Sequence, residues 1–509
     1  MNEENFDHQL GVLLREEVPP PGPSFWDEVD ARLQSVSVET PDDASSRLDF
    51  DLTELSPGSP DPTRPNRLML VAAAAALIAI GLAGFFALGG SDRSELDVTD
   101  DNGIGEVTND DAEEEDETDG AAIEQTPWRQ VGDDIEAGAF GSFVGDELAI
   151  SGDGNTVAVR TITADSRDAS DPDDFTRTAW VLRWNGTTWE QLGDPFVSGH
   201  IGFLATPVAL SSDGNTLVLG EPFGLSPVAR ILRWDGSAWI ELGAGIPFAF
   251  NDDALGQTVA VSADGNTVAL GDPAASTISD RIGRVRVYRW DGENWSTLGE
   301  GAFDESADSL GNAIDISGDG NRLVAGGFDI DRAFVFEWNG TDWEQIGSAL
   351  TPDTDANLFF GEAVAISGDG ETVAVGGPLA NGDELPIASV FRLIDGTWVE
   401  VGQRIEGDDS SNLFAISLDL STDGNTVVVG EPGGGPDDPG RSHVFTWTGE
   451  TWQEVGPPIS FDDSDIGKVV SISADGSTVA LGGNVSPDGG PDTNADSGRV
   501  RVLRIENDG

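Results

Sequence analysis

The sequence predicts an all-β protein, a seven-bladed β-propeller of four-stranded antiparallel blades, which follows a single transmembrane helix and a short helical or disordered cytoplasmic segment. Two observations predict the propeller: a hairpin motif that recurs seven times, and a tryptophan-containing strand that also occurs seven times but begins before the first hairpin. A third observation, an uncharged apolar segment ahead of the repeats, predicts the membrane span.

Composition limits the classes of partner and chemistry. The chain has 509 residues, of which 38% are hydrophobic, enough to bury a core over most of its length. It carries 93 acidic against 26 basic side chains, a formal charge of −67, so nucleic acid and anionic surfaces should repel it and no nucleic-acid partner is expected. Cysteine is absent, which excludes disulfides, thiol nucleophiles and cysteine-bound metals.

Residues 1–67 are predicted to form a cytoplasmic segment with short amphipathic helices. The run Pro19–Pro23 separates two such patterns, because it cannot continue a helix. In the second pattern Ser24 can cap the helix, and Trp26 and Leu33 fall near one face. This helix could dock a cytosolic partner, or it could be a stub lying beside the membrane.

Residues 68–90 are predicted to cross the membrane. From Leu68 to Leu88 the chain has 21 residues without a charge, close to the roughly 20 that span a bilayer. Arg64 and Arg67 precede this segment and Asp92 follows it, so the positive-inside rule predicts a cytoplasmic N-terminus and an extracytoplasmic C-terminal part. A leader that is cleaved late, or a buried alanine-rich helix, is the alternative.

Residues 91–126 are predicted to be an acidic, disordered linker. Between Ser91 and Thr126 the sequence has 15 acidic residues against the single basic residue Arg93. Repulsion among these charges should keep the linker extended, so that it acts as a spacer between the membrane and residues 127–509.

The hairpin motif recurs at intervals of 50 to 60 residues, which suits the blades of a propeller. Each copy has two apolar runs around an Asp-Gly turn, a strong hairpin signal. The copies read AISGDGNTVAV from Ala149, ALSSDGNTLVLG from Ala209, AVSADGNTVALG from Ala260, DISGDGNRLVAGG from Asp315, AISGDGETVAVGG from Ala365, DLSTDGNTVVVG from Asp419 and SISADGSTVALGG from Ser471. A second hairpin lies between successive copies, as in RVRVYRWDGENWSTLG from Arg284, so each repeat should contain four antiparallel strands.

The ends of the repeat region predict how the ring closes. The outermost strands begin at Trp128, Trp189, Trp239, Trp295, Trp343, Trp398 and Trp452. The first of them, residues 128–132, stands alone, and the last repeat lacks such a strand. The N-terminal strand is therefore expected to complete the C-terminal blade, which removes open sheet edges. An open β-solenoid is the alternative, but it does not explain the displaced strand.

The repeats, such as FGEAVAISGDGETVAVGGP from Phe360 and ALGQTVAVSADGNTVALGDP from Ala254, resemble bacterial FG-GAP-type repeats, the family that includes the integrin alpha-chain propeller. The resemblance covers roughly residues 127–507 and implies a propeller that binds ligands. Some blades of that family bind calcium through a DxDxDG-like loop. Here each turn has one Asp followed by Gly, so no calcium ligands are assigned by the resemblance.

No catalytic, cofactor-binding or metal-binding residues are predicted. Turn pairs such as Asp153-Gly154 are interpreted as structural, and the paired tryptophans as packing within hairpins, with stacking on sugars as the alternative. The acidic loops 165–174 and 486–497 could hold Ca²⁺ through oxygen ligands, or could simply be solvated.

The predicted function is a membrane-anchored, extracytoplasmic propeller that binds a protein or glycan ligand at the cell surface. No enzymatic activity is expected. One alternative is a transmembrane signalling regulator, because a cytosolic helical segment, one span and an outer domain resemble the order in anti-sigma factors, although the His/Cys zinc motif common there is impossible without cysteine. A second alternative is a propeller hydrolase or lyase that acts on polysaccharides.

Overall fold

The computed structural model describes most of the predicted propeller. The described residues are 127–136, 142–164, 175–197, 207–221, 229–247, 254–273, 283–302, 309–327, 331–352, 358–379, 385–407, 413–433, 440–461, 465–484 and 498–505. The predicted cytoplasmic segment, membrane span and linker, residues 1–126, lie outside them. In these described ranges, no helix has the length and apolar character needed to span a membrane.

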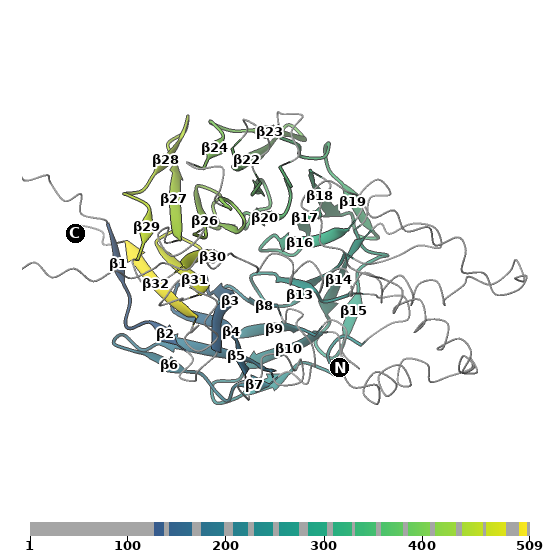
Figure 1. Ribbon diagram of the computed structural model, residues 1–509. Helices are drawn as coiled ribbons and strands as arrows, with labels where there is room; N and C mark the ends of the chain where they lie inside the picture. The colour runs from purple at the N-terminus through teal and green to yellow at the C-terminus, as the bar shows by residue number, and fades with distance from the viewer. Residues whose placement is uncertain are drawn as a thin grey trace, which may run out of the picture. The chain divides into compact units, whose positions relative to one another are not determined.

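The described strands form seven antiparallel sheets arranged as blades around a centre, as the sequence predicts (Figure 1). The strands are given from the centre outward. Blade 1 has β3 (Ser142–Ile150), β4 (Thr156–Ala164), β5 (Phe175–Trp184) and β6 (Trp189–Gln191), and blade 2 has β8 (Val208–Leu210), β9 (Thr216–Gly220), β10 (Ala229–Trp234) and β11 (Trp239–Glu241). Blade 3 has β12 (Thr258–Val261), β13 (Thr267–Asp272), β14 (Arg284–Trp290) and β15 (Trp295–Thr297), and blade 4 has β16 (Leu310–Ile316), β17 (Arg322–Gly327), β18 (Ala333–Trp338) and β19 (Trp343–Gln345).

Blades 5 to 7 follow the same order. Blade 5 has β20 (Ala363–Ile366), β21 (Thr372–Gly377), β22 (Ile387–Ile394) and β23 (Thr397–Glu400), and blade 6 has β25 (Leu418–Leu420), β26 (Thr426–Glu431), β27 (Arg441–Trp447) and β28 (Trp452–Glu454). Blade 7 has β30 (Asp465–Ile472), β31 (Thr478–Asn484), β32 (Arg499–Ile505) and β1 (Trp128–Gln130). Four short strands also pair with the third strand of a blade, namely β2 (Ile135–Glu136), β7 (Phe196–Val197), β24 (Ile405–Glu406) and β29 (Ile459–Ser460).

The hydrophobic core lies in the seams between adjacent blades. The second strands β9, β13 and β21 are buried at every residue, because a neighbouring blade covers each of their faces. In the seam between blades 4 and 5, for example, Val335 packs in one cluster with Phe360 and Val373. This explains why the second run of each motif reads as continuous apolar residues.

The ring closes as the sequence predicts. Trp128 of β1 pairs with Ile505 of β32, so the first described strand completes the last blade (Figure 1). The innermost strands contact one another in a closed series, in which β30 contacts β3. An open β-solenoid is therefore wrong, since each innermost strand has a neighbour on both sides.

A continuous ring of backbone hydrogen bonds connects the seven blades near the centre. It uses the residue that precedes the turn aspartate in each motif, and each N–H donates to the carbonyl of the equivalent residue in the next blade at 2.8–3.2 Å. The ring runs through Gly152, Ser212, Ala263, Gly318, Gly368, Thr422 and Ala474 and returns to Gly152. A Cβ added at Gly152 would lie 2.2 Å from Ser212 Oγ, so glycine is favoured at this position of the ring.

The Asp-Gly hairpins are confirmed, but the turn is longer than a two-residue hairpin. In blade 1 the N–H of Ser151 donates to the carbonyl of Thr156, which leaves four residues in the loop. Gly154 has a φ of 67°, in the region that glycine adopts without steric cost. The serine before each loop is thus part of the turn, although a two-residue Asp-Gly hairpin does not require it.

Strand direction divides the propeller into two faces. Because the strands alternate in direction, the Asp-Gly turns and the turns between third and fourth strands share one end of every blade, here called the turn face. The remaining connections start and finish at the opposite end, here called the loop face, at strand ends such as Ala164 and Phe175. All turns of the turn face belong to the described residues.

Candidate functional site

The turn face is occupied by its own hydrogen bonds. Ser151 Oγ donates to Asp153 Oδ1 at 2.6 Å and accepts the N–H of Thr156 at 2.9 Å, while the N–H of Asn155 donates to Asp153 Oδ1 at 2.9 Å. Partial burial opposes ionisation of Asp153, but the hydrogen bonds from Ser151 and Asn155 outweigh it and lower the pKa of this carboxyl. The turn aspartates are therefore structural, as interpreted from the sequence.

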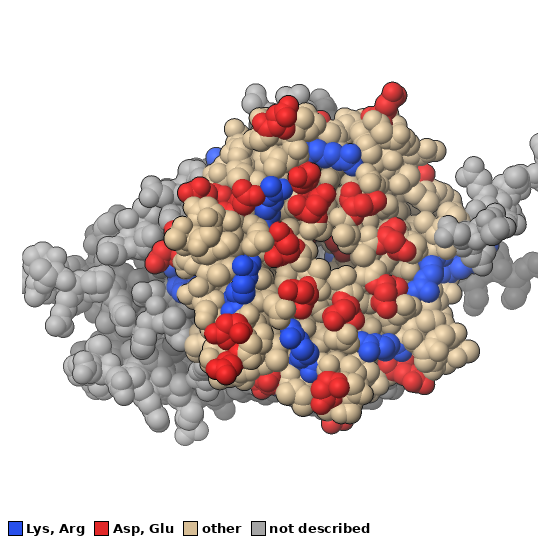
Figure 2. Space-filling view, turned by 180° about the vertical axis from the view of Figure 1, so that it is seen from behind, with Lys and Arg blue, Asp and Glu red and all other residues tan. Residues whose placement is uncertain are grey.

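Arginines connect the Asp-Gly turns of blades 1, 2, 3, 4 and 6 to the preceding blade. Arg183 Nη2 donates to the carbonyl of Gly214 at 2.9 Å and to Asn215 Oδ1 at 3.1 Å, both in the turn of blade 2, and its Nε donates to Thr156 at 2.9 Å. Arg504 makes the same bonds to Gly154 and Asn155, across the closure. The equivalent arginines of blades 2, 3 and 5 are Arg233, Arg289 and Arg392. Figure 2 shows acidic and basic side chains interleaved around the centre of the propeller.

Tryptophans fill the outer part of each seam. Trp184 and Trp189 pack with ring centroids 5.5 Å apart, and Trp189 Nε1 donates at 2.7 Å to the carbonyl of Val131 in the preceding outer strand. The glycine after that strand leaves room for the rings, because a Cβ on Gly132 would lie 2.5 Å from Trp184. The same bond is made by Trp128, Trp239, Trp295, Trp398 and Trp452. The rings thus pack within hairpins and against the next blade, as the packing interpretation predicts, and Trp184 and Trp189 remain partly exposed.

A pocket of about 210 Å³ opens in the seam between blades 5 and 6, near the loop face. Its size exceeds by far the roughly 15 Å³ that a single water needs on this measure. The pocket is lined by Gln403, Arg404, Ile405, Glu406, Gly407, His443, Phe445, Glu454 and Pro458. Several polar groups and one aromatic ring in a concave site are the usual features of a ligand site.

His443 forms one wall of this pocket and is held between two carboxylates. Its Nε2 lies 2.8 Å from Glu431 Oε2 and its Nδ1 lies 2.8 Å from Glu454 Oε1. Burial alone would favour the neutral ring, but the hydrogen bonds and charges of both glutamates outweigh it and raise the pKa of His443. Because both ring nitrogens face carboxylates, the ring is positioned as an imidazolium that donates twice. Arg441 adds a further bond to Glu431 at 3.2 Å.

Two aspartates replace alanine on innermost strands. Asp315 Oδ2 accepts the N–H of Ile366 in the next blade at 2.8 Å, and Asp419 Oδ2 accepts the N–H of Ile472 at 2.9 Å. Both aspartates are half-buried. Burial, with the charge of Asp419, raises the pKa of Asp315 to about 7, and burial also raises the pKa of Asp419. Both side chains thus connect neighbouring blades through hydrogen bonds, and burial disfavours their ionised form.

The raised pKa of Asp315 predicts a fall in stability with rising pH. The folded protein holds this proton up to about pH 7, whereas the unfolded chain releases it near pH 3.8. The contribution of this proton to the free energy of unfolding is therefore fully present below about pH 4 and is lost by about pH 7. The loss is at most about 4 kcal/mol. Asp419→Ser, which copies Ser471 of blade 7, should reduce this fall because it removes the neighbouring charge. We expect denaturant unfolding from pH 4 to 7 to show a shallower slope in Asp419→Ser, and an unchanged slope in the control Ala365→Ser. Superimposable profiles for Asp419→Ser and the unaltered chain would contradict the prediction.

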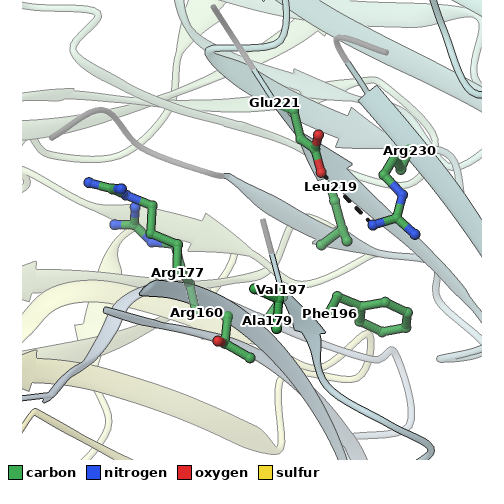
Figure 3. Close-up of a pocket in the computed structure, with 9 residues that line it drawn as sticks. Arg160, Arg177, Ala179, Phe196, Val197, Leu219, Glu221 and Arg230 are labelled. Atoms are coloured by element: carbon green, nitrogen blue, oxygen red, sulfur yellow. Dashed lines mark ion pairs between the residues drawn. The ribbon is translucent and has the colours of Figure 1, made fainter. Parts of the chain in front are cut away.

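A smaller pocket lies in the seam between blades 1 and 2, also near the loop face (Figure 3). Arg160 of β4 and Arg177 of β5 run side by side along it, with their guanidinium groups together and directed away from the ion pair of Glu221 and Arg230. Arg177 is only 2% exposed. Its burial, with the adjacent Arg160, lowers the pKa of Arg177.

The sequence pattern predicts no site residues and no role for His443, Arg177 or Asp315. The only signals were local departures from the repeat, such as Asp315 and Asp419 in place of alanine, and their significance depends on contacts between blades. The acidic loops 165–174 and 486–497, considered for Ca²⁺, lie outside the described residues. Within the described part of the chain, no group of three or more His, Asp or Glu side chains could hold a metal ion.

Comparisons with known proteins show no family for this chain. No protein-family model matches it, and no curated protein matches it. Among solved structures, a functionally unknown protein from Desulfotomaculum acetoxidans is 17% identical, with 64% of this chain and 90% of that chain covered and a TM-score of 0.40. The Cps50 (Swd1) β-propeller domain of Myceliophteria thermophila is 11% identical, with 74% and 99% covered and a TM-score of 0.44.

The periplasmic gluconolactonase PpgL of Pseudomonas aeruginosa is 17% identical, with 62% of this chain and 85% of that chain covered and a TM-score of 0.41. Similarities at these TM-scores carry no argument about activity. The resemblance to FG-GAP repeats is likewise not confirmed by any family match. The strand pairing, rather than a relative, establishes that this chain forms a seven-bladed β-propeller.

Proposed function

We propose that this propeller is a binding module that recognises a glycan or protein ligand at its loop face. The observation that carries the proposal is the difference between the two faces. On the turn face the Asp-Gly loops are occupied by bonds within and between blades, as with Arg183 and Gly214. The polar pocket of about 210 Å³ lies near the opposite face, in the seam between blades 5 and 6.

A glycan suits the chemistry of this pocket best. Arg404, Glu406 and Glu454 offer charged donors and acceptors for hydroxyl groups, and Phe445 offers an apolar surface for a sugar ring. His443 is fixed by Glu431 and Glu454. That arrangement supports binding rather than catalysis, because a ring held between two carboxylates is not free to act as a general base.

The proposal includes a location. Residues 68–90 would anchor the chain in the cell membrane, with residues 1–67 in the cytoplasm and the propeller outside, connected by the acidic spacer 91–126. The uncharged segment and its flanking arginines, Arg64 and Arg67, support this orientation. Cross-linking of the intact chain in its native membrane, followed by mapping of the linked residues, tests it. Partners on residues 127–509 support a binding module, whereas partners only on residues 1–67 would favour the signalling alternative.

Arg404 provides the test of the pocket. Nε of Arg404 has no hydrogen-bond partner among the described residues, so Arg404→Met should remove a ligand contact without breaking a bond of the fold. The loss of one charge-assisted hydrogen bond, about 1.5–3 kcal/mol, predicts binding weakened about 10- to 100-fold. The measurement is binding of the full-length chain to a glycan array, followed by titration of each glycan retained.

Arg129→Met, on the outer strand of blade 7, serves as the matched control and should bind as the unaltered chain does, because Arg129 does not line this pocket. Glycan binding that is equally strong in Arg404→Met would place the ligand elsewhere on the propeller. A chain that retains no glycan but is cross-linked to a protein through residues 403–407 would show that the same pocket recognises a protein.

A further inference from the structure

The seam between blades 1 and 2 contains a buried positive charge that no described residue neutralises. Arg177 is only 2% exposed, and its Nε and Nη1 have no hydrogen-bond partner among the residues that the structure describes. A guanidinium is charged at every accessible pH, and buried charges in proteins are normally paired. Arg160, which is 5% exposed, lies beside it and adds a second positive charge (Figure 3).

The one carboxylate that lines this pocket faces another arginine. Glu221 lies 3.9 Å from Arg230 Nη1, and Figure 3 shows this pair on the side of the pocket away from the guanidinium of Arg177. Arg230 also pairs with Glu241 at 3.3 Å, so its charge is compensated away from Arg177. Among the described lining residues, Arg177 is thus the buried cation for which no pairing carboxylate is described, in a chain whose formal charge is −67.

The rest of the lining makes the site selective. Ala179, Phe196 and Leu219 are apolar, so they exclude water from the guanidinium groups and strengthen their attraction for an anion. The enclosed space is about 10 Å³, roughly one water on this measure, so only the end of a ligand can enter. A carboxylate matches these limits, because its two oxygens fit the planar fork of a guanidinium.

We propose that the seam between blades 1 and 2 is a binding site for the carboxylate group of an acidic ligand, with Arg177 as the residue that pairs with it and Arg160 as the second positive charge. This site is separate from the pocket between blades 5 and 6, so it goes beyond the function proposed above. A sugar acid is one ligand that would carry such a group.

The test is thermal unfolding of the full-length chain with formate, the smallest carboxylate, and with neutral formamide as the matched compound. Ionic strength is kept constant with bulky organic ions that cannot enter the pocket. We expect formate to raise Tm saturably by about 2 °C or more and formamide to have no effect, since a ligand that binds only the folded state stabilises it. Galacturonate against galactose extends the comparison to sugars, and a rise with galacturonate alone would also support the site.

Two arginines of the same strand separate ligand binding from folding. Arg177→Met should abolish the response to formate and leave Tm equal to or above that of the unaltered chain without formate, because it removes an unpaired buried charge. Arg183→Met should lower Tm, because Arg183 bonds Thr156, Gly214 and Asn215, but should keep the response to formate.

Three results would overturn the proposal. The first is an equal response to formate in Arg177→Met, and the second is no response to either carboxylate in the unaltered chain. The third is a response to formate that appears only in a variant with five Asp-to-Asn changes, at Asp165, Asp168, Asp171, Asp173 and Asp174. That result would mean that the chain itself supplies the carboxylate that pairs with Arg177. None of these results bears on Arg404, so the proposal for this seam and the proposal for the pocket between blades 5 and 6 are tested independently.

Discussion

Trp128→Ala should lower the free energy of unfolding of the propeller by about 3–5 kcal/mol, the usual cost of removing a buried tryptophan. Trp128 is 2% exposed, and its Nε1 donates at 3.1 Å to the carbonyl of Val455 in the neighbouring blade. It also begins the strand β1 that pairs with β32 and closes the ring. Loss of this strand would expose the edge of β32, so we expect aggregation in addition to lower stability. Denaturant unfolding and light scattering measure the two effects.

Trp239→Ala is the matched control for closure. Trp239 has the equivalent position in blade 2 and makes the equivalent bond to Leu192 at 2.7 Å, but its strand β11 joins β10 through a short turn. It should lose packing energy without opening the ring, so limited proteolysis should release the N-terminal strand faster from Trp128→Ala only. Equal release from both variants would show that β1 does not depend on Trp128 to stay paired.

Glu431→Gln should destabilise the protein by about 3–5 kcal/mol, because it breaks a buried network of charges. Glu431 is 1% exposed and accepts from His443 at 2.8 Å and from Arg441 at 3.2 Å. The amide removes the charge that holds the imidazolium, so the pKa of His443 should fall. Chemical denaturation at pH 6 measures the loss.

The pH dependence gives the sign of the His443 contribution. Because the pKa of His443 is raised in the folded state, its stabilisation is present below its ordinary value of about 6.5 and is lost as pH rises through the raised value. The difference between Glu431→Gln and the unaltered chain should therefore shrink as pH rises above that range. Glu221→Gln is the control from blade 2, where the described ion pair is with Arg230 at the longer distance of 3.9 Å, and it should cost less at every pH. A difference that does not change with pH would mean that His443 is not charged in the folded protein.

Much of the fold is predictable because it depends on local patterns that repeat. The seven Asp-Gly turns mark seven hairpins, and the isolated strand at Trp128 predicts closure, since a four-stranded blade without its outer strand leaves an open edge. Turn chemistry is local, so residues such as Asp153 and Gly154 can be assigned from sequence. The role of Ser151 was not predicted, because a two-residue turn does not require it.

The candidate sites were not predictable in this way. Arg177, His443 and Asp315 belong to contacts between blades, where the partners are separated by long stretches of chain or differ from one blade to the next. Arg183 and Arg177 are both arginines of β5, six residues apart, yet one bonds the turn of blade 2 and the other is buried without a described partner. No pattern along the chain distinguishes them.

By itself the sequence determined the repeat, the number of blades, the position of the closing strand and the structural nature of the Asp-Gly turns, because these follow from periodicity and short-range turn chemistry. Only the tertiary structure decided that the tryptophans pack between blades and that a backbone ring joins the seven turns. It also decided which charges are paired and which lie in the seams. The physical reason is that the electrostatic environment of a buried charge is set by side chains from the adjacent blade, which lie far away in sequence but within a few ångströms in the fold.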